Sequence, residues 1–147
     1  MRLATQQDLD TFYDKSIFDI NIYPYLSTST YISKPELPKD DWSGIYLVSE
    51  DLRCLLKISI DRTRDIEFNI SLYSFSSFLA GKAIIALKEI IRRYKPKAIN
   101  SVVHSSNIKS LKLHHKYFGK PWGIEPVSAY NMGLGSYEDL HYFRMLF

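Results

Sequence analysis

A turn with a single glycine, at residues 74–81, joins a strand pattern to a helix pattern and could bind an anion. Residues 66–73 alternate apolar and polar side chains, and residues 82–94 repeat apolar side chains at three- and four-residue spacing. Ser76 or Ser77 can cap the start of this helix, with Gly81 within its first turn or so. A helix start leaves backbone N–H groups unpaired, and the missing side chain of Gly81 would let a ligand approach them. This arrangement predicts a phosphate site. A glycine that only relieves crowding between helix and sheet is the alternative.

Three side chains near this unit could transfer protons. Glu67 lies on the polar face of the predicted strand, and His114 and Tyr117 lie one turn apart on a later predicted helix. An imidazole titrates near neutral pH, so His114 is suited to acid or base chemistry. With His104 and His115 it would form a local cluster, but no acidic residues stand at metal-ligand spacing, so we predict no metal site. An exposed or core position is the alternative for each of these residues.

Other catalytic patterns are absent from the sequence. It contains neither a Gly-x-Ser-x-Gly nucleophile elbow nor a Walker loop. The loop with Gly133, Gly135 and Ser136 is typical of a turn before a last strand. Because Cys54 is the only cysteine, an intramolecular disulfide and a multi-cysteine zinc site are excluded.

Composition indicates one soluble domain. A chain of 147 residues fits a single domain, and 46% hydrophobic with 24% charged residues excludes wholesale disorder. The net charge is +3, and lysine and arginine residues are concentrated in the second half of the chain. These residues would suit a phosphorylated ligand but do not establish nucleic-acid binding. No secretory signal and no run of roughly 18 apolar residues is present, so we expect a cytoplasmic protein without a membrane segment.

The elements that must position these residues alternate between strands and helices, which predicts a mixed α/β single domain. Thr5 is suited to cap a first helix because Asp8 stands three residues later. The expected order is a strand at 1–4, a helix at 6–17, a short helix within 16–26, a polar loop at 27–41 over a binding site, strands at 42–50, 53–61 and 66–73, a helix at 82–94, a strand at 97–104, a helix from 107, and strands at 123–132 and 139–147.

This order resembles the GNAT acyltransferases over nearly the whole chain. The opening residues 2–10 are similar to the family's first strand and helix. The family's coenzyme loop has Arg or Gln, two residues, Gly, one residue, then Gly or Ala. Gly81 and Ala83 match the last two places, and Phe78 occupies the first.

A second match lies on the later predicted helix. In the family an asparagine is followed at three residues by a small residue and at six by an apolar one, and Asn107, Ser110 and Leu113 fill these places. A tyrosine commonly follows immediately and protonates the departing thiolate. Here that place is held by His114.

The resemblance implies an α/β (α+β) fold, with one GNAT-like domain over residues 1–147 and a central mixed, mostly antiparallel sheet flanked by helices. It implies acetyl-CoA as co-substrate and transfer of the acetyl group to an unidentified amine by direct attack. Glu67 would be the base, and His114, or alternatively Tyr117, the acid. Backbone N–H groups from Leu79 to Ala83 would bind the pyrophosphate, and the backbone of Tyr73 and its neighbours would pair with the pantetheine arm. The expected coenzyme-binding residues are Leu72, Tyr73, Phe78, Leu79, Ala80, Gly81, Lys82, Ala83, Asn107 and Ser110.

Two further functions stay open at this point. The first is a catalytically inactive GNAT-fold binding or assembly protein, like the bacteriophage head-assembly and internal virion proteins that resemble GNAT domains, and it fits Phe78 and His114. The second is an acetyltransferase acting on a charged nucleic-acid adaptor, which only the basic second half supports. A homodimer or a protein assembly partner is compatible with either.

Overall fold

The computed structural model describes residues 1–26, 34–63 and 65–147, in which seven strands form one sheet. The elements are β1 (Arg2–Leu3), α1 (Gln6–Ser16), a 3₁₀ helix (Tyr23–Tyr25), β2 (Gly44–Val48), β3 (Cys54–Asp61), β4 (Glu67–Ser74), α2 (Ser77–Tyr94), β5 (Ala98–His104), α3 (Ile108–Phe118), β6 (Gly123–Asn131) and β7 (Ser136–Leu146). The sheet order is β1-β2-β3-β4-β5-β7-β6, and only the β4–β5 pair is parallel.

The predicted order of elements is confirmed, with three differences. The short helix expected within 16–26 is a single 3₁₀ turn at Tyr23–Tyr25. The long helix begins at Ser77, where Ser76 caps it as predicted, so it extends five residues before the apolar repeat at 82–94. The last strand begins at Ser136 and is therefore longer than predicted. Part of the polar loop expected at 27–41 lies outside the described residues.

The start of α1 is fixed by the predicted cap. The Thr5 side chain accepts from the Asp8 backbone N–H, and the Asp8 carboxylate accepts from the Thr5 N–H at 2.8 Å, which completes a capping box. Arg2 donates to both oxygens of Asp8 at 2.6 and 2.8 Å, so the short β1 is tied to the helix. This guanidinium and the Thr5 N–H hold the pKa of Asp8 well below its usual value.

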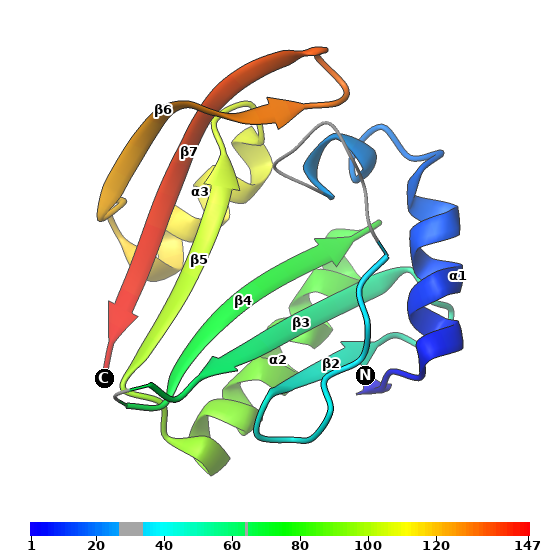
Figure 1. Ribbon diagram of the computed structural model, residues 1–147, viewed down its shortest axis with the longest axis vertical. Coiled ribbons are helices and arrows are strands. Elements are labelled where there is room, and N and C mark those ends of the chain that lie inside the picture. The colour runs from blue at the N-terminus through cyan, green and yellow to red at the C-terminus, as the bar shows by residue number, and fades with distance from the viewer. Residues whose placement is uncertain (27–33, 64) are drawn as a thin grey trace.

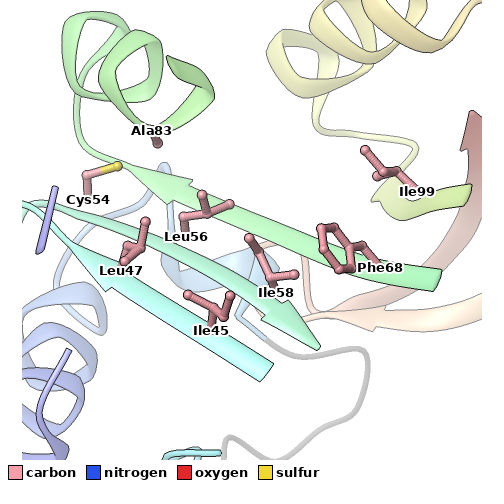
Figure 2. Packing of buried hydrophobic residues seen from close by; sticks show 8 residues of the cluster. All are labelled: Ile45, Leu47, Cys54, Leu56, Ile58, Phe68, Ala83 and Ile99. Carbon is pink, nitrogen blue, oxygen red and sulfur yellow. The ribbon is translucent and has the colours of Figure 1, made fainter. Parts of the chain in front are cut away.

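Helices cover both faces of the sheet (Figure 1). On one face Leu9, Phe12 and Tyr13 of α1 pack against Val48 and Leu55. The opposite face packs against α2. Figure 2 shows Ala83 of that helix directed toward the side chains of the strands, and the labelled cluster is Ile45, Leu47, Cys54, Leu56, Ile58, Phe68, Ala83 and Ile99.

The two central strands, β4 and β5, diverge. They pair only from Glu67–Ile70 against Ala98–Ser101, although both strands continue beyond these residues. Figure 1 shows the two ribbons moving apart toward their arrowheads. The Ile70–Ser101 pair, which we call the apex, is therefore the last contact before the sheet opens.

The connection between β6 and β7 is a turn, as its glycines predicted. Gly135 has φ +66°, which favours glycine, and a side chain on Gly133 would lie 2.5 Å from Pro24. Asn131 accepts from the backbone N–H groups of Gly133 and Leu134.

None of the helices in the described part of the chain is long and apolar enough to span a membrane.

Candidate active site

Beyond the apex, toward the carboxyl ends of β4 and β5, which we call above it, the edge of β4 that faces β5 carries backbone groups without a partner among the described residues. The Ile70 carbonyl lies 3.3 Å from Ser101 Oγ, and the Ile66 carbonyl accepts from the Lys97 N–H at 2.8 Å, so even-numbered residues of this strand face β5. Alternation along a strand then directs the backbone groups of Leu72 and Ser74 into the opening. These groups can pair with an extended ligand as another strand would.

The same alternation limits the backbone contact that was expected from Tyr73 and its neighbours. Its backbone faces β3, where it is paired with Leu55, and the Phe75 N–H donates to the Arg53 carbonyl on the same side. The Tyr73 side chain packs on the α1 face, where burial raises the pKa of its hydroxyl. Within the expected stretch of Tyr73 and its neighbours, the backbone groups available to a pantetheine arm are therefore those of Leu72 and Ser74.

The anion-binding N–H groups also lie earlier than predicted. Because the helix begins at Ser77, the Leu79 N–H is held by Ser76 Oγ at 3.3 Å and the Ala80 N–H by the Ser76 carbonyl at 3.1 Å. The N–H groups from Gly81 onward belong to the helical ladder. At the start of α2, the N–H groups without a partner among the described residues are those of Ser77 and Phe78. The donors expected from Leu79 to Ala83 are thus not available.

Gly81 and Phe78 stand three residues apart on α2 and have different surroundings. A Cβ on Gly81 would meet no atom within 4 Å, so the glycine does not relieve crowding with the sheet. It shares a helix face with Ile84 and Lys88, which line a cavity. Phe78 is 70% exposed, and Lys82 Nζ lies 4.7 Å from the centre of its ring. Neither Phe78 nor Lys82 lines that cavity.

An apolar cavity of about 370 Å³ lies between α2 and α3, against the sheet at the apex. Its volume falls in the range of small-molecule sites. Neither helix seals it, since α3 has no fully buried residue and Ala83 is the only one on α2. Six residues singled out from the sequence line it: Leu72, Ala83, Ser110, Leu113, His114 and Tyr117.

A serine and a histidine meet at the apex on the cavity wall. Ser101 Oγ lies 2.9 Å from His114 Nε2, and His114 Nδ1 lies 2.8 Å from the Ser110 carbonyl. A carbonyl only accepts, so the proton is on Nδ1, and Nε2 accepts from the Ser101 hydroxyl. Burial lowers the pKa of His114, which keeps the ring neutral at pH 7. At rest this pair is a proton acceptor.

Ser101 was not singled out from the sequence, although a signal was present. It is the one polar residue on the side of β5 that faces α2 and α3, where it lies between Ile99 and Val103, and it is 7% exposed. A polar side chain in an apolar alternation needs a partner when buried. His114 supplies it.

The other residues expected on α3 have different positions. Asn107 caps the helix, with Oδ1 accepting from the Ser110 N–H at 3.1 Å. This oxygen is therefore engaged within the protein. Tyr117 is 43% exposed and lines the cavity one turn further from the opening than His114 does.

Glu67 lies on the closed side of the apex in an ion pair. Its Oε1 accepts from Arg144 Nη2 at 2.6 Å, and its Oε2 accepts from Asn100 Nδ2 at 3.1 Å and from Arg144 Nη1 at 3.0 Å. The hydrogen bond from Arg144, followed by that from Asn100, lowers the pKa of this carboxyl. It stands three residues before Ile70, roughly 10 Å along the strand. This position favours a structural link between strands β4, β5 and β7.

A second titratable pair lies on the α1 face of the sheet. His104 Nδ1 contacts Glu138 Oε1 at 2.6 Å, and both side chains are less than a tenth exposed. Asn131 Nδ2 and the Ser106 N–H also donate to this carboxylate, whose pKa is lowered although burial acts to raise it. His104 Nε2 is buried without a partner among the described residues, and the Tyr25 ring lies 5.5 Å from the imidazole. The sequence suggested that His104 clusters with the histidines of α3, and this prediction is wrong, because His104 lies on the opposite face of the sheet.

Comparison with known proteins establishes the fold. No protein-family model and no curated protein sequence matches the chain. Solved structures do match it along 99% of its length. An N-acetyltransferase from Staphylococcus aureus is 15% identical, with a TM-score of 0.72 over 96% of that chain. An acetyltransferase of the GNAT family from Streptococcus pneumoniae is 13% identical, with a TM-score of 0.70 over 98% of that chain.

A third match carries a ligand. A Salmonella typhimurium protein assigned as an acetyltransferase, solved with its cofactor acetyl-CoA, is 16% identical, with a TM-score of 0.73 over 91% of that chain. At these identities the likeness is one of fold, and the chain has the GNAT fold, as its motifs suggested.

Proposed function

We propose that this protein is an acetyl-CoA-dependent N-acetyltransferase that transfers the acetyl group to an amine by direct attack. One observation carries the proposal. The sheet opens at the apex beside an apolar cavity, and the opening is bordered by the unpaired backbone groups of Leu72 and Ser74. An extended thioester-bearing arm would complete these hydrogen bonds. The likeness to an acetyl-CoA-bound structure supports the same ligand.

The coenzyme would be held by backbone more than by side chains. The free N–H groups of Ser77 and Phe78, at the positive end of the 18-residue helix α2, would bind the pyrophosphate. Gly81 would let the coenzyme pass close to the helix, because its Cβ position is open space. The pantetheine arm would then run along Leu72 and Ser74 to the apex.

The Ser101–His114 pair would move the proton during transfer. The neutral amine attacks the thioester carbonyl carbon, so that the N–C bond forms and the C–S bond breaks. The proton of the attached nitrogen passes to Ser101 Oγ while the serine hydroxyl proton passes to His114 Nε2. The return of this proton through Ser101 to the departing thiolate restores the pair. His114 would thus protonate the thiolate after first serving as the base.

Glu67 as the base is the competing assignment. Its two oxygens are occupied by Arg144 and Asn100, and its lowered pKa weakens it as a proton acceptor. His104 is a further candidate on the α1 face, because Glu138 engages its Nδ1 and leaves Nε2 unpaired. Substituting Glu67→Gln, Ser101→Ala and His104→Gln separately assigns the base, since only the substitution of the working group lowers turnover without weakening coenzyme binding.

A GNAT-fold binding protein without turnover is the second candidate function. The observation that favours it is the ion pair of Glu67, which removes a free carboxylate from β4. Phosphate contacts to nucleic acid, the third candidate, would show as salt-sensitive retention on RNA.

Calorimetric titration of the purified protein with acetyl-CoA tests the proposal. We expect saturable binding, and release of free thiol from acetyl-CoA when a panel of polyamines, amino acids and peptides is supplied. No binding at millimolar acetyl-CoA would reject the enzymatic function. Binding without thiol release for any amine would favour the non-catalytic protein.

A further inference from the structure

We infer that this protein accepts, besides acetyl-CoA, donors with a longer acyl chain of roughly six to ten carbons, that it binds them more tightly, and that the chain lies in the cavity between α2 and α3. This inference rests on the proposed function, because it places the coenzyme thioester at the apex. It adds a chemical class of donor that the acetyltransferase fold does not itself imply.

The cavity extends well beyond the apex. Its upper wall includes Leu72 and Ser110, which border the proposed path of the pantetheine arm. Its lower wall is formed by Ile91, Ile99 and Met145, on the far side of the apex from the coenzyme entrance. A chain attached to a thioester at the apex would therefore continue into the lower part without changing direction.

The length of the lower part matches a medium-length chain. Phe147, which lines the cavity, is bonded through its N–H to the Lys97 carbonyl at 3.0 Å. Lys97 lies four residues below Ser101, roughly 13 Å along an extended strand. With carbon–carbon bonds of about 1.5 Å in a zigzag, this span takes roughly ten carbons.

The chemistry of the wall also matches an alkyl chain. Below the apex the wall is made of mostly apolar side chains from α2, β5 and β7 and of Tyr117 and Phe118 of α3, and the cationic groups of Lys88 and Arg92 stand along α2. The nearest polar pair, Ser101 and His114, bonds to itself and to backbone. An acetyl group would leave this apolar space unfilled, whereas each buried methylene is removed from water favourably.

Binding of an acyl-CoA series, measured by calorimetry without any amine acceptor, tests the inference. The ligands are coenzyme A, acetyl-CoA, hexanoyl-CoA and decanoyl-CoA. A fully buried methylene strengthens binding about fourfold. Allowing for incomplete burial, we expect hexanoyl-CoA to bind at least tenfold more tightly than acetyl-CoA.

Two matched variants on one helix locate the chain. Ile91→Trp fills the lower cavity and should remove the gain with chain length while acetyl-CoA still binds. Ile85→Trp, on the same helix, places the same residue where the side chain is 64% exposed and should keep the gain. Met145→Phe is a second filling variant from β7, with the same expectation, should Ile91→Trp not fold.

The outcomes separate the two proposals. Equal affinity for acetyl-CoA and decanoyl-CoA would overturn the inference and leave the acetyltransferase standing. A chain-length gain that persists in both filling variants would also overturn it, because the chain would then lie elsewhere. Failure of every ligand, coenzyme A included, would overturn the inference together with the proposed function.

Discussion

Replacing Gly81 by glutamate tests where the coenzyme phosphates bind. The glycine lies one turn inside α2, beyond the free N–H groups of Ser77 and Phe78, and a Cβ there meets no atom within 4 Å. The substitution should therefore not disturb the fold. Glycine is less favourable than alanine inside a helix by about 1 kcal/mol, and glutamate is a good helix former, so the variant should be as stable as the wild type or more so.

The size of the binding defect follows from charge. With a carboxylate about 6 Å from each of two phosphate charges, the total repulsion is about 1 kcal/mol at the dielectric constant of water and about 5 kcal/mol at the value typical near a protein surface. The affinity for acetyl-CoA should fall at least tenfold by calorimetry. Part of the loss should be recovered at high salt, because exposed charges are screened.

Gly81→Gln is the matched control for this substitution. Glutamine has nearly the shape of glutamate without its charge, so the difference between the two variants measures the repulsion alone. Gly81→Ala, which adds only a methyl group, should raise Tm by roughly 2–4 °C in thermal unfolding. If glutamate, glutamine and wild type all bound acetyl-CoA with equal affinity, the start of α2 would not be the phosphate site.

Three further expectations concern proton chemistry. Ser101→Ala and His114→Gln should each lower kcat at least tenfold with little change in acetyl-CoA affinity. Because burial lowers the pKa of His114, the acid limb of the wild-type pH–rate profile should lie below pH 6.5, and it should vanish in the histidine variant. Glu67→Gln should leave kcat within about threefold and lower Tm; a larger loss of kcat would restore the carboxylate as the base. The stability that Asp8 contributes is present above the usual carboxyl pKa and is lost as pH falls through the lowered native pKa. In acid unfolding, Asp8→Asn should therefore flatten the decline of the free energy of unfolding at low pH, and Asp10→Asn is the control that should leave this decline unchanged.

Local patterns in the sequence predicted the elements because each is specified by residues close in the chain. Thr5 and Asp8 form the capping box that their spacing indicates, and the alternation of residues 66–73 places Phe68 in the core. The order of elements, together with the two partial motifs at Gly81 and Asn107, suggested the GNAT fold by resemblance.

Features that depend on contacts between distant segments could not be predicted in the same way. The ion pair of Glu67 with Arg144 joins residues 77 positions apart, so the sequence left the carboxylate seemingly free. Ser101 and His114 come from different elements and meet only because α3 packs over β5. The cap decides which groups can bind an anion, because the N–H groups of Leu79 and Ala80 are already bonded to Ser76.

The departure at Phe78 affects the proposed coenzyme site less than its place in the motif suggests. The side chain stacks with Lys82 on the exposed side of α2, while its backbone N–H remains one of the two free groups at the helix start. Backbone direction, not the side chain, therefore supplies the anion contact that the structure offers. A missing arginine at this position removes a charge from the rim and should weaken coenzyme binding, whereas the apolar cavity below the apex would strengthen it through the acyl chain. A donor with a longer chain would thus offset the weaker phosphate contact, which links the altered motif to the chain-length preference inferred from the cavity.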